Sequence, residues 1–255
     1  MGMAVITGGS RGMGRATALR FARNGHDVAV TYRSRRAEAE EVVRRIESCG
    51  RRALAVPMEV RRQADVDAAF TRIEERFGKI DYLFANAAIF PGLHPMVEQT
   101  WAGWEELLTV NVIGQWYCAK RAIENMLRHG GGGAVVYNSS ISGVMTFPLA
   151  SDYAASKHAV VGMAKAQALE FARHRIRVNV VCPGFFQTDM FQENYAGPPS
   201  EHLTKNVVPA ERIADPEEVA SLVYWLLVDG TYCHGSIIVA DGGITAGPKL
   251  QESAG

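Results

Sequence analysis

The chain has 255 residues, 47% of them apolar and 21% charged, and its 27 basic residues balance 27 acidic ones. This composition excludes an intrinsically disordered chain, which would be poorer in apolar residues or unevenly charged. It also argues against a nucleic-acid partner, because binding to phosphates needs a basic excess. We therefore expect a soluble domain with a large core.

Short β-branched or aliphatic runs alternate with longer amphipathic stretches along the chain. The runs predict strands at residues 3–7, 27–32, 52–56, 80–85, 134–138, 177–182 and 236–239. The amphipathic stretches predict helices at residues 12–24, 35–49, 63–77, 101–129, 152–174 and 216–229. Such alternation is typical of right-handed crossovers, so we expect an α/β fold: a doubly wound parallel sheet of about seven strands with helices on both faces.

The order of the elements indicates one domain, residues 1–246, followed by a flexible tail at 247–255. Residues 185–209 break the alternation with Pro198, Pro199 and several aromatic residues. Long insertions of this kind usually form a lid or a binding loop, so we expect a mobile substrate loop there.

The sequence shows no pattern typical of a membrane span, a signal peptide or a metal site. No apolar run is long enough to span a bilayer, and the first residues read as a buried strand rather than a signal peptide. The four cysteines and seven histidines lack the spacing of metal ligands. We expect a cytoplasmic protein with no metal site.

A glycine turn, Gly8-x-x-x-Gly12-x-Gly14, follows the first predicted strand and opens the first helix. Glycines in this position let the backbone approach a pyrophosphate, which then lies at the helix N-terminus. An ordinary strand-to-helix loop is the alternative interpretation. The absence of Gly-Lys-Ser/Thr argues against a nucleoside-triphosphate loop.

The end of the second predicted strand bears on the choice of cofactor. An NAD site places a carboxylate there, whereas this strand ends in Tyr32 and Arg33 with no acid. Arg33 and Arg11 are suited to a 2′-phosphate, which predicts NADP. Arg35 and Arg36 can also be read as a solvated basic start to the next helix.

Tyr153 and Lys157 lie four residues apart at the start of a helical pattern and so share one face. An ammonium and a nicotinamide ring nearby would lower the tyrosine pKa toward neutrality. Ser140 lies thirteen residues upstream, at the end of the fifth predicted strand, and Ser139 is a competing serine.

Together these motifs resemble the short-chain dehydrogenase/reductase family over nearly the whole chain. The resemblance implies a Rossmann-type fold that binds NADP(H), with Ser140 on the substrate carbonyl, Tyr153 as proton donor and Lys157 as its partner. It also implies that Asn111 holds a water that reprotonates Tyr153; a buried Asn that only satisfies backbone groups is the alternative. The cofactor-binding residues that it implies are Gly8, Ser10, Arg11, Gly12, Met13, Gly14, Tyr32, Arg33, Ser34, Glu59, Val60, Asn86, Ala87, Ala88, Tyr153, Lys157, Pro183, Gly184, Phe186 and Thr188.

Two residues depart from the family pattern. Ala88 stands where the family usually has Gly, and Glu59 stands where it has Asp. Either change could weaken cofactor binding, but neither residue takes part in the chemical step.

The sequence is most similar to 3-oxoacyl-carrier-protein reductase-like ketoreductases, which implies NADPH-dependent reduction of a ketone, either a 3-oxoacyl thioester or a secondary-metabolite carbonyl. The alternatives are oxidation of a sugar or small alcohol, and a non-catalytic NADP sensor. For a carrier-protein-bound substrate, a basic patch at 128–129 and 173–175 is a candidate docking site, although solvated helix ends explain these residues equally well. Apolar residues on more than one face of helices 101–129 and 152–174 predict a homotetramer.

Overall fold

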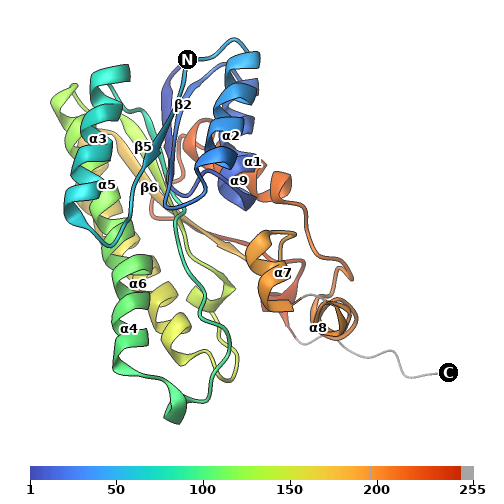
Figure 1. The fold of residues 1–255 in the computed structure, drawn as a ribbon. Helices are drawn as coiled ribbons and strands as arrows, with labels where there is room; N and C mark the ends of the chain where they lie inside the picture. The colour runs from blue at the N-terminus through green and yellow to red at the C-terminus, as the bar shows by residue number, and fades with distance from the viewer. Residues whose placement is uncertain (196, 248–255) are drawn as a thin grey trace.

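One parallel sheet forms the centre of the protein in the computed structural model, which describes residues 1–195 and 197–247 (Figure 1). Its strand order is β3-β2-β1-β4-β5-β6-β7, and every neighbouring pair is parallel. The expected doubly wound α/β fold is therefore confirmed. The strands are β1 (Met3–Ile6), β2 (Asp27–Tyr32), β3 (Ala53–Pro57), β4 (Tyr82–Ala85), β5 (Gly133–Asn138), β6 (Ile176–Pro183) and β7 (Ile237–Ala240).

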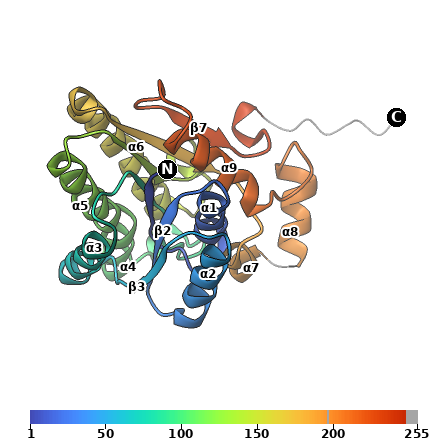
Figure 2. The same ribbon diagram turned by 90° about the horizontal axis from the view of Figure 1, so that it is seen from above.

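Helices cover both faces of the sheet, as Figure 2 shows from above. Each face has its own buried apolar cluster, because the central strands direct alternate side chains to opposite sides. One face carries α1 (Gly12–Arg23), α2 (Arg36–Ser48) and α9 (Pro216–Leu227). The other carries α3 (Gln63–Phe77), α5 (Gln115–Arg128) and α6 (Ser151–Phe171), with α4 (Trp101–Leu108) before α5.

The single helix expected at residues 101–129 is interrupted. α4 and α5 are joined by a wider, π-type turn, Thr109–Gly114, which contains the buried Asn111. The Asn111 side chain bonds to backbone groups of a neighbouring segment, a tertiary contact that helical periodicity does not report.

The expected loop at 185–209 is mostly helical. It forms α7 (Asp189–Tyr195), α8 (Pro198–His202) and a π-type turn, Leu203–Val207. The tail expected at 247–255 lies outside the described residues except for Gly247. Among the helices described, none combines the length and apolarity needed to cross a membrane.

Candidate active site

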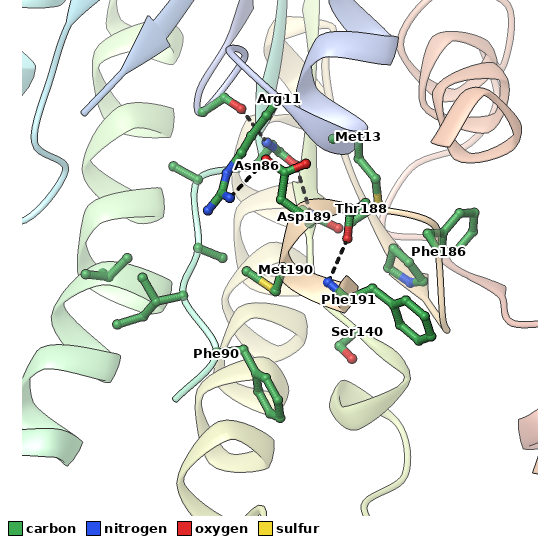
Figure 3. A pocket seen from close by; sticks show the side chains of 18 of the residues that line it. Arg11, Met13, Asn86, Phe90, Ser140, Phe186, Thr188, Asp189, Met190 and Phe191 are labelled. Carbon is green, nitrogen blue, oxygen red and sulfur yellow. Dashed lines mark hydrogen bonds and ion pairs between the residues drawn. The ribbon is translucent and has the colours of Figure 1, made fainter. Parts of the chain in front are cut away.

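A cavity of about 330 Å³ opens at the carboxyl edge of the sheet, the edge at which the strands end. Its walls come from the turn after β1, the ends of β2 to β5, the start of α6, and the segment from the end of β6 into α7. β1 lies between β2 and β4, so the strand order reverses at this point. Open parallel sheets bind ligands at such a switch point. Side chains from these elements converge there (Figure 3).

The turn between β1 and α1 presents backbone to the cavity. Gly8 and Gly12 have φ angles of +65° and +52°, a region that glycine adopts without the penalty of a Cβ. Arg11 precedes α1 without capping it by a side-chain hydrogen bond. The first N–H groups of the helix and its dipole are suited to an anion, so the turn fits the pyrophosphate of a dinucleotide.

Gly14 does not line the cavity with the other two glycines. A Cβ at this position would lie 2.4 Å from the carbonyl oxygen of Gly8 and 2.7 Å from Asn86 Nδ2. The structure therefore gives Gly14 a packing role, because only a glycine lets α1 approach the turn so closely, and its contact with the cofactor stays a prediction.

A hydrogen-bond network fixes the glycine turn against the end of β4. Thr7 Oγ1 accepts from the backbone N–H groups of Asn86 (2.9 Å) and Ala87 (3.0 Å). Asn86 Nδ2 donates to the carbonyl oxygens of Thr7 (2.9 Å) and Gly8 (3.3 Å). Asn138 Nδ2 donates in turn to Asn86 Oδ1 (3.0 Å). The network holds the floor of the cavity in one geometry.

Basic side chains gather where β2 ends. Arg11, Arg33 and Arg35 line this end of the cavity, and no ion pair involves Arg33 within the described part of the chain. Arg11 Nη1 lies 3.1 Å from Asp189 Oδ2 and 2.8 Å from Glu193 Oε1, both in α7 (Figure 3 draws the Asp189 contact).

Arg35 lies farther from the same two carboxylates, at 3.5 and 3.8 Å. Arg36 pairs instead with Glu40 on the exposed side of α2. A solvated role therefore suits Arg36, whereas Arg35 belongs to the cavity.

Ser140, Tyr153 and Lys157 meet in the inner part of the cavity. Tyr153 and Lys157 lie in the first turns of α6, and the Lys157 ammonium lies 5.5 Å from the centroid of the Tyr153 ring. Lys157 Nζ donates to the carbonyl oxygen of Asn138 (3.0 Å), which directs it toward the cavity floor. The competing Ser139 is buried and donates its hydroxyl to the carbonyl oxygen of Lys157 (2.9 Å). Ser140 is thus the serine whose side chain is better placed for a ligand.

Burial sets the ionisation of this pair. Desolvation raises the pKa of Tyr153 to about 12, although a hydrogen bond with the Ser140 side chain acts in the opposite direction. The expected lowering of the tyrosine pKa is therefore not produced by the protein groups alone. Burial also lowers the pKa of Lys157 to about 7. At neutral pH Tyr153 is protonated and Lys157 is near its titration point.

Asn111 lies outside the cavity lining. Its Oδ1 accepts from the backbone N–H of Ile89 (2.9 Å), and its Nδ2 donates to the carbonyl oxygen of Ile89 (3.0 Å) and contacts Ser156 Oγ (3.3 Å). The side chain therefore braces the segment after β4. The expected role of Asn111 in holding a water stays a prediction.

The remaining cofactor candidates all lie along the cavity. The structure places there Ser10, Met13, Tyr32, Ser34, Glu59, Val60, Ala88, Pro183, Gly184, Phe186 and Thr188. Ala88 has no positive φ, so its methyl group causes no backbone strain. The longer Glu59 carboxylate pairs with Arg61 at 3.2 Å.

An apolar end of the cavity lies beside Tyr153, and the substrate loop expected at 185–209 supplies part of it. Phe90, from the segment after β4, packs edge-on against Tyr153 with ring centroids 4.8 Å apart. Among the other apolar lining residues, Phe185, Met190, Phe191 and Tyr195 lie in that expected loop, whereas Ile89, Leu93, Ile141 and Phe147 were not expected. For Ile89 and Ile141, the available signal was their position a few residues after the end of a strand.

The candidate docking patch at 128–129 and 173–175 lies at the amino edge of the sheet, where the strands begin. These residues directly precede β5 and β6, whose first residues Gly133 and Ile176 pair with each other. Arg128 is paired with Glu74 at 2.8 Å. The cavity opens at the opposite edge, so a carrier protein docked on this patch does not face it.

In the part of the chain that the structure describes, no group of three or more His, Cys, Asp or Glu side chains could hold a metal ion.

Comparison with known proteins places the chain among oxidoreductases. A protein-family profile described as Enoyl-(Acyl carrier protein) reductase matches residues 8–245. A 3beta-hydroxysteroid dehydrogenase 1 of Eggerthella lenta is 35% identical, covering 98% of this chain and 96% of its own. An A-factor type gamma-butyrolactone 1'-reductase (1S-forming) of Streptomyces virginiae is 36% identical, covering 95% of each chain.

Solved structures agree with this placement. A short chain dehydrogenase from Burkholderia cenocepacia, crystallised in complex with NADP, superposes with a TM-score of 0.87 at 33% identity. The match covers 95% of this chain and 97% of that one. These similarities extend over the sheet, the glycine turn and the cavity together.

Proposed function

The chain belongs to the short-chain dehydrogenase/reductase family, and from that premise we propose that it reduces a ketone to a secondary alcohol with NADPH. Family membership makes it an oxidoreductase of alcohols and carbonyl compounds that uses a nicotinamide cofactor. The relatives described above are named for a hydroxysteroid and a butyrolactone, and these names support a carbonyl substrate for this chain.

The observation that carries the proposal is the meeting of Ser140, Tyr153 and Lys157 between a dinucleotide cradle and an apolar cavity end. A nicotinamide cofactor, when bound, supplies the hydride. Ser140 donates a hydrogen bond to the substrate carbonyl oxygen and orients it, and Tyr153 donates its proton to that oxygen as negative charge develops there. The Lys157 ammonium stabilises the resulting phenolate.

The ionisation of Tyr153 is compatible with its role as the acid in reduction. With its pKa raised to about 12, the phenol keeps its proton at neutral pH and can act as the acid that reduction requires. Oxidation of an alcohol needs the phenolate as base, a form that a bound nicotinamide cofactor would favour.

Tyr153→Phe tests the catalytic assignment. The ring keeps its packing against Phe90 while the proton donor is lost, so turnover should fall by at least about a hundredfold with little change in NADPH binding. Ser140→Ala should lower turnover by a smaller factor than Tyr153→Phe, because Ser142 lies beside Ser140 and offers a second hydroxyl. The assay follows the absorbance of reduced nicotinamide over a panel of ketones. A Tyr153→Phe enzyme that keeps more than about a tenth of its activity would return the chain to the class of cofactor-binding proteins without turnover.

The choice of NADP rests on Arg11, Arg33 and Arg35 and on the missing acid at the end of β2. A charge-assisted pair contributes roughly 1.5–3 kcal/mol, so kcat/KM should favour NADPH over NADH by at least about tenfold. Arg33→Asp should erase or reverse this preference. Equal use of both cofactors by the unmodified enzyme contradicts the assignment.

A further inference from the structure

We infer that the substrate is an uncharged, ring-bearing ketone held on an aromatic wall that α7 completes; this inference rests on the proposed ketone reduction. The wall begins at the catalytic tyrosine. Phe90 meets Tyr153 edge-on at 4.8 Å between centroids, and Tyr195 of α7 stacks on Phe90 at 6.1 Å with an interplanar angle of 21°.

Two further rings extend the wall from Tyr195. Phe185 meets it edge-on at 5.6 Å, and Phe191 lies 5.5 Å away at 30°. Phe185 and Phe191 also contact each other, at 6.0 Å. In the view of Figure 3, Phe90 and Phe191 lie on either side of Ser140. A carbonyl held by Ser140 and Tyr153 therefore carries its remaining atoms onto aromatic faces and edges.

Charged side chains and apolar side chains line different ends of the cavity. Among the lining residues in the described part of the chain, Arg11, Arg33, Arg35, Glu59 and Asp189 gather around the glycine turn and the ends of β2 and β3. The substrate end is lined by Phe90, Leu93, Phe147, Met190, Phe191 and Tyr195. Of the charged lining residues that the structure describes, the buried Lys157 lies beside this end, and it already donates to the carbonyl oxygen of Asn138. An anionic substrate would lose its hydration there without gaining a cation.

The alternative thioester substrate finds no support at this end. Coenzyme A and the carrier-protein arm both bring phosphate, and the basic cluster at 128–129 and 173–175 lies at the opposite edge of the sheet. A flexible acyl chain would also lose rotational freedom against a rigid wall, whereas a fused ring arrives already ordered. Flat rings gain the most contact from ring faces and edges in this arrangement.

Three ketone probes separate these possibilities: 2-tetralone, the straight-chain 2-decanone with the same carbon count, and the anionic acetoacetyl-coenzyme A. Each is assayed for kcat/KM with NADPH and with NADH on the full-length enzyme. We expect 2-tetralone to exceed 2-decanone by about tenfold, and acetoacetyl-coenzyme A by more than that.

Variants of the wall supply the second measurement. Tyr195→Ala and Phe90→Leu should raise the KM for 2-tetralone by about tenfold, with a smaller rise for the compact 2-butanone and no change in the Kd of NADPH. Tyr232 is fully exposed and lies away from the cavity, so Tyr232→Ala serves as the matched control. It should leave both KM values and the Kd of NADPH unchanged. Thermal melts verify that each variant is folded.

The outcomes separate a failure of the proposed ketone reduction from a failure of the aromatic-wall assignment. Reduction of none of these ketones with either cofactor overturns the proposed function itself. Reduction with acetoacetyl-coenzyme A or 2-decanone as the best substrate, or equal losses for 2-tetralone and 2-butanone in the wall variants, overturns the aromatic-wall assignment and leaves the ketone reduction standing.

Discussion

At the scale of a single residue, the cavity has its strongest effect on the charge of Lys157. The side chain is 1% exposed, and burial brings its pKa down to about 7 from an ordinary value of 10.5. Its ammonium form is the one that stabilises the Tyr153 phenolate formed during proton donation. Below about pH 7 that form dominates, and it is lost as the pH rises.

The rate of ketone reduction should therefore decline as the pH rises through about 7. The measurement is the pH profile of kcat/KM between about pH 5 and 9. Lys157→Arg keeps a positive charge at every pH in that range. The decline of kcat/KM with rising pH should therefore vanish in this variant, even though the larger side chain lowers the overall rate. A wild-type profile that stays level to about pH 9 contradicts the assignment of the titrating group.

At the scale of elements, α7 couples the two ends of the cavity. Its carboxylates Asp189 and Glu193 pair with Arg11, and its rings Phe191 and Tyr195 belong to the aromatic wall. The same arginines are the candidates for the cofactor 2′-phosphate. The carboxylates of α7 and that phosphate therefore compete for one set of cations.

Asp189→Asn combined with Glu193→Gln should tighten NADPH binding by releasing Arg11, while Arg35 keeps its pair with Glu38 at 3.4 Å. These pairs are partly exposed, with side-chain exposures of 34% to 54%, so each contributes little and the gain should be about three- to tenfold. Titration by nicotinamide fluorescence gives the Kd, and NADH, which lacks the phosphate, should bind as before. Glu217→Gln removes a comparably exposed pair with Arg23, at 3.2 Å, and is the matched control. Equal tightening for both cofactors refutes the competition.

The regular elements could be predicted because their signals are local. Continuous apolar runs such as Val28 to Val30 gave the buried strands, and the glycine turn and the Tyr153–Lys157 spacing gave most of the cavity floor. The missed features depend on tertiary contacts. Phe90 becomes a site residue only because β4 ends beside α6, and Asn111 widens its helical turn because it bonds to Ile89.

At the scale of the whole molecule, the apolar surface of α5 and α6 bears on assembly. Several apolar residues in and beside these helices, among them Val110, Val160 and Ala164, are buried in the core of their own chain. Others stay exposed: Ile113 by 53%, Trp116 by 42%, and Leu169 of α6 by 83%. An exposed apolar set of this kind is suited to a symmetric contact between copies of the chain.

We accordingly expect a homotetramer in solution, built from isologous contacts of these helices. Light scattering should give about four times the 27.8 kDa mass of one chain at micromolar concentration. Ile113→Asp combined with Trp116→Asp should yield smaller species, because burying the new carboxylates opposes association. A wild-type mass equal to that of a single chain refutes the tetramer.

The basic cluster at the amino edge has a practical consequence for handling the protein. It lies across the sheet from the cavity, and β1 begins at the same edge, so Met1 does too. Attachment of a chain through this cluster, or by a covalent tether at Met1, would leave its cavity on the side away from the support. The parallel sheet thus gives the protein a natural orientation for attachment to a solid support.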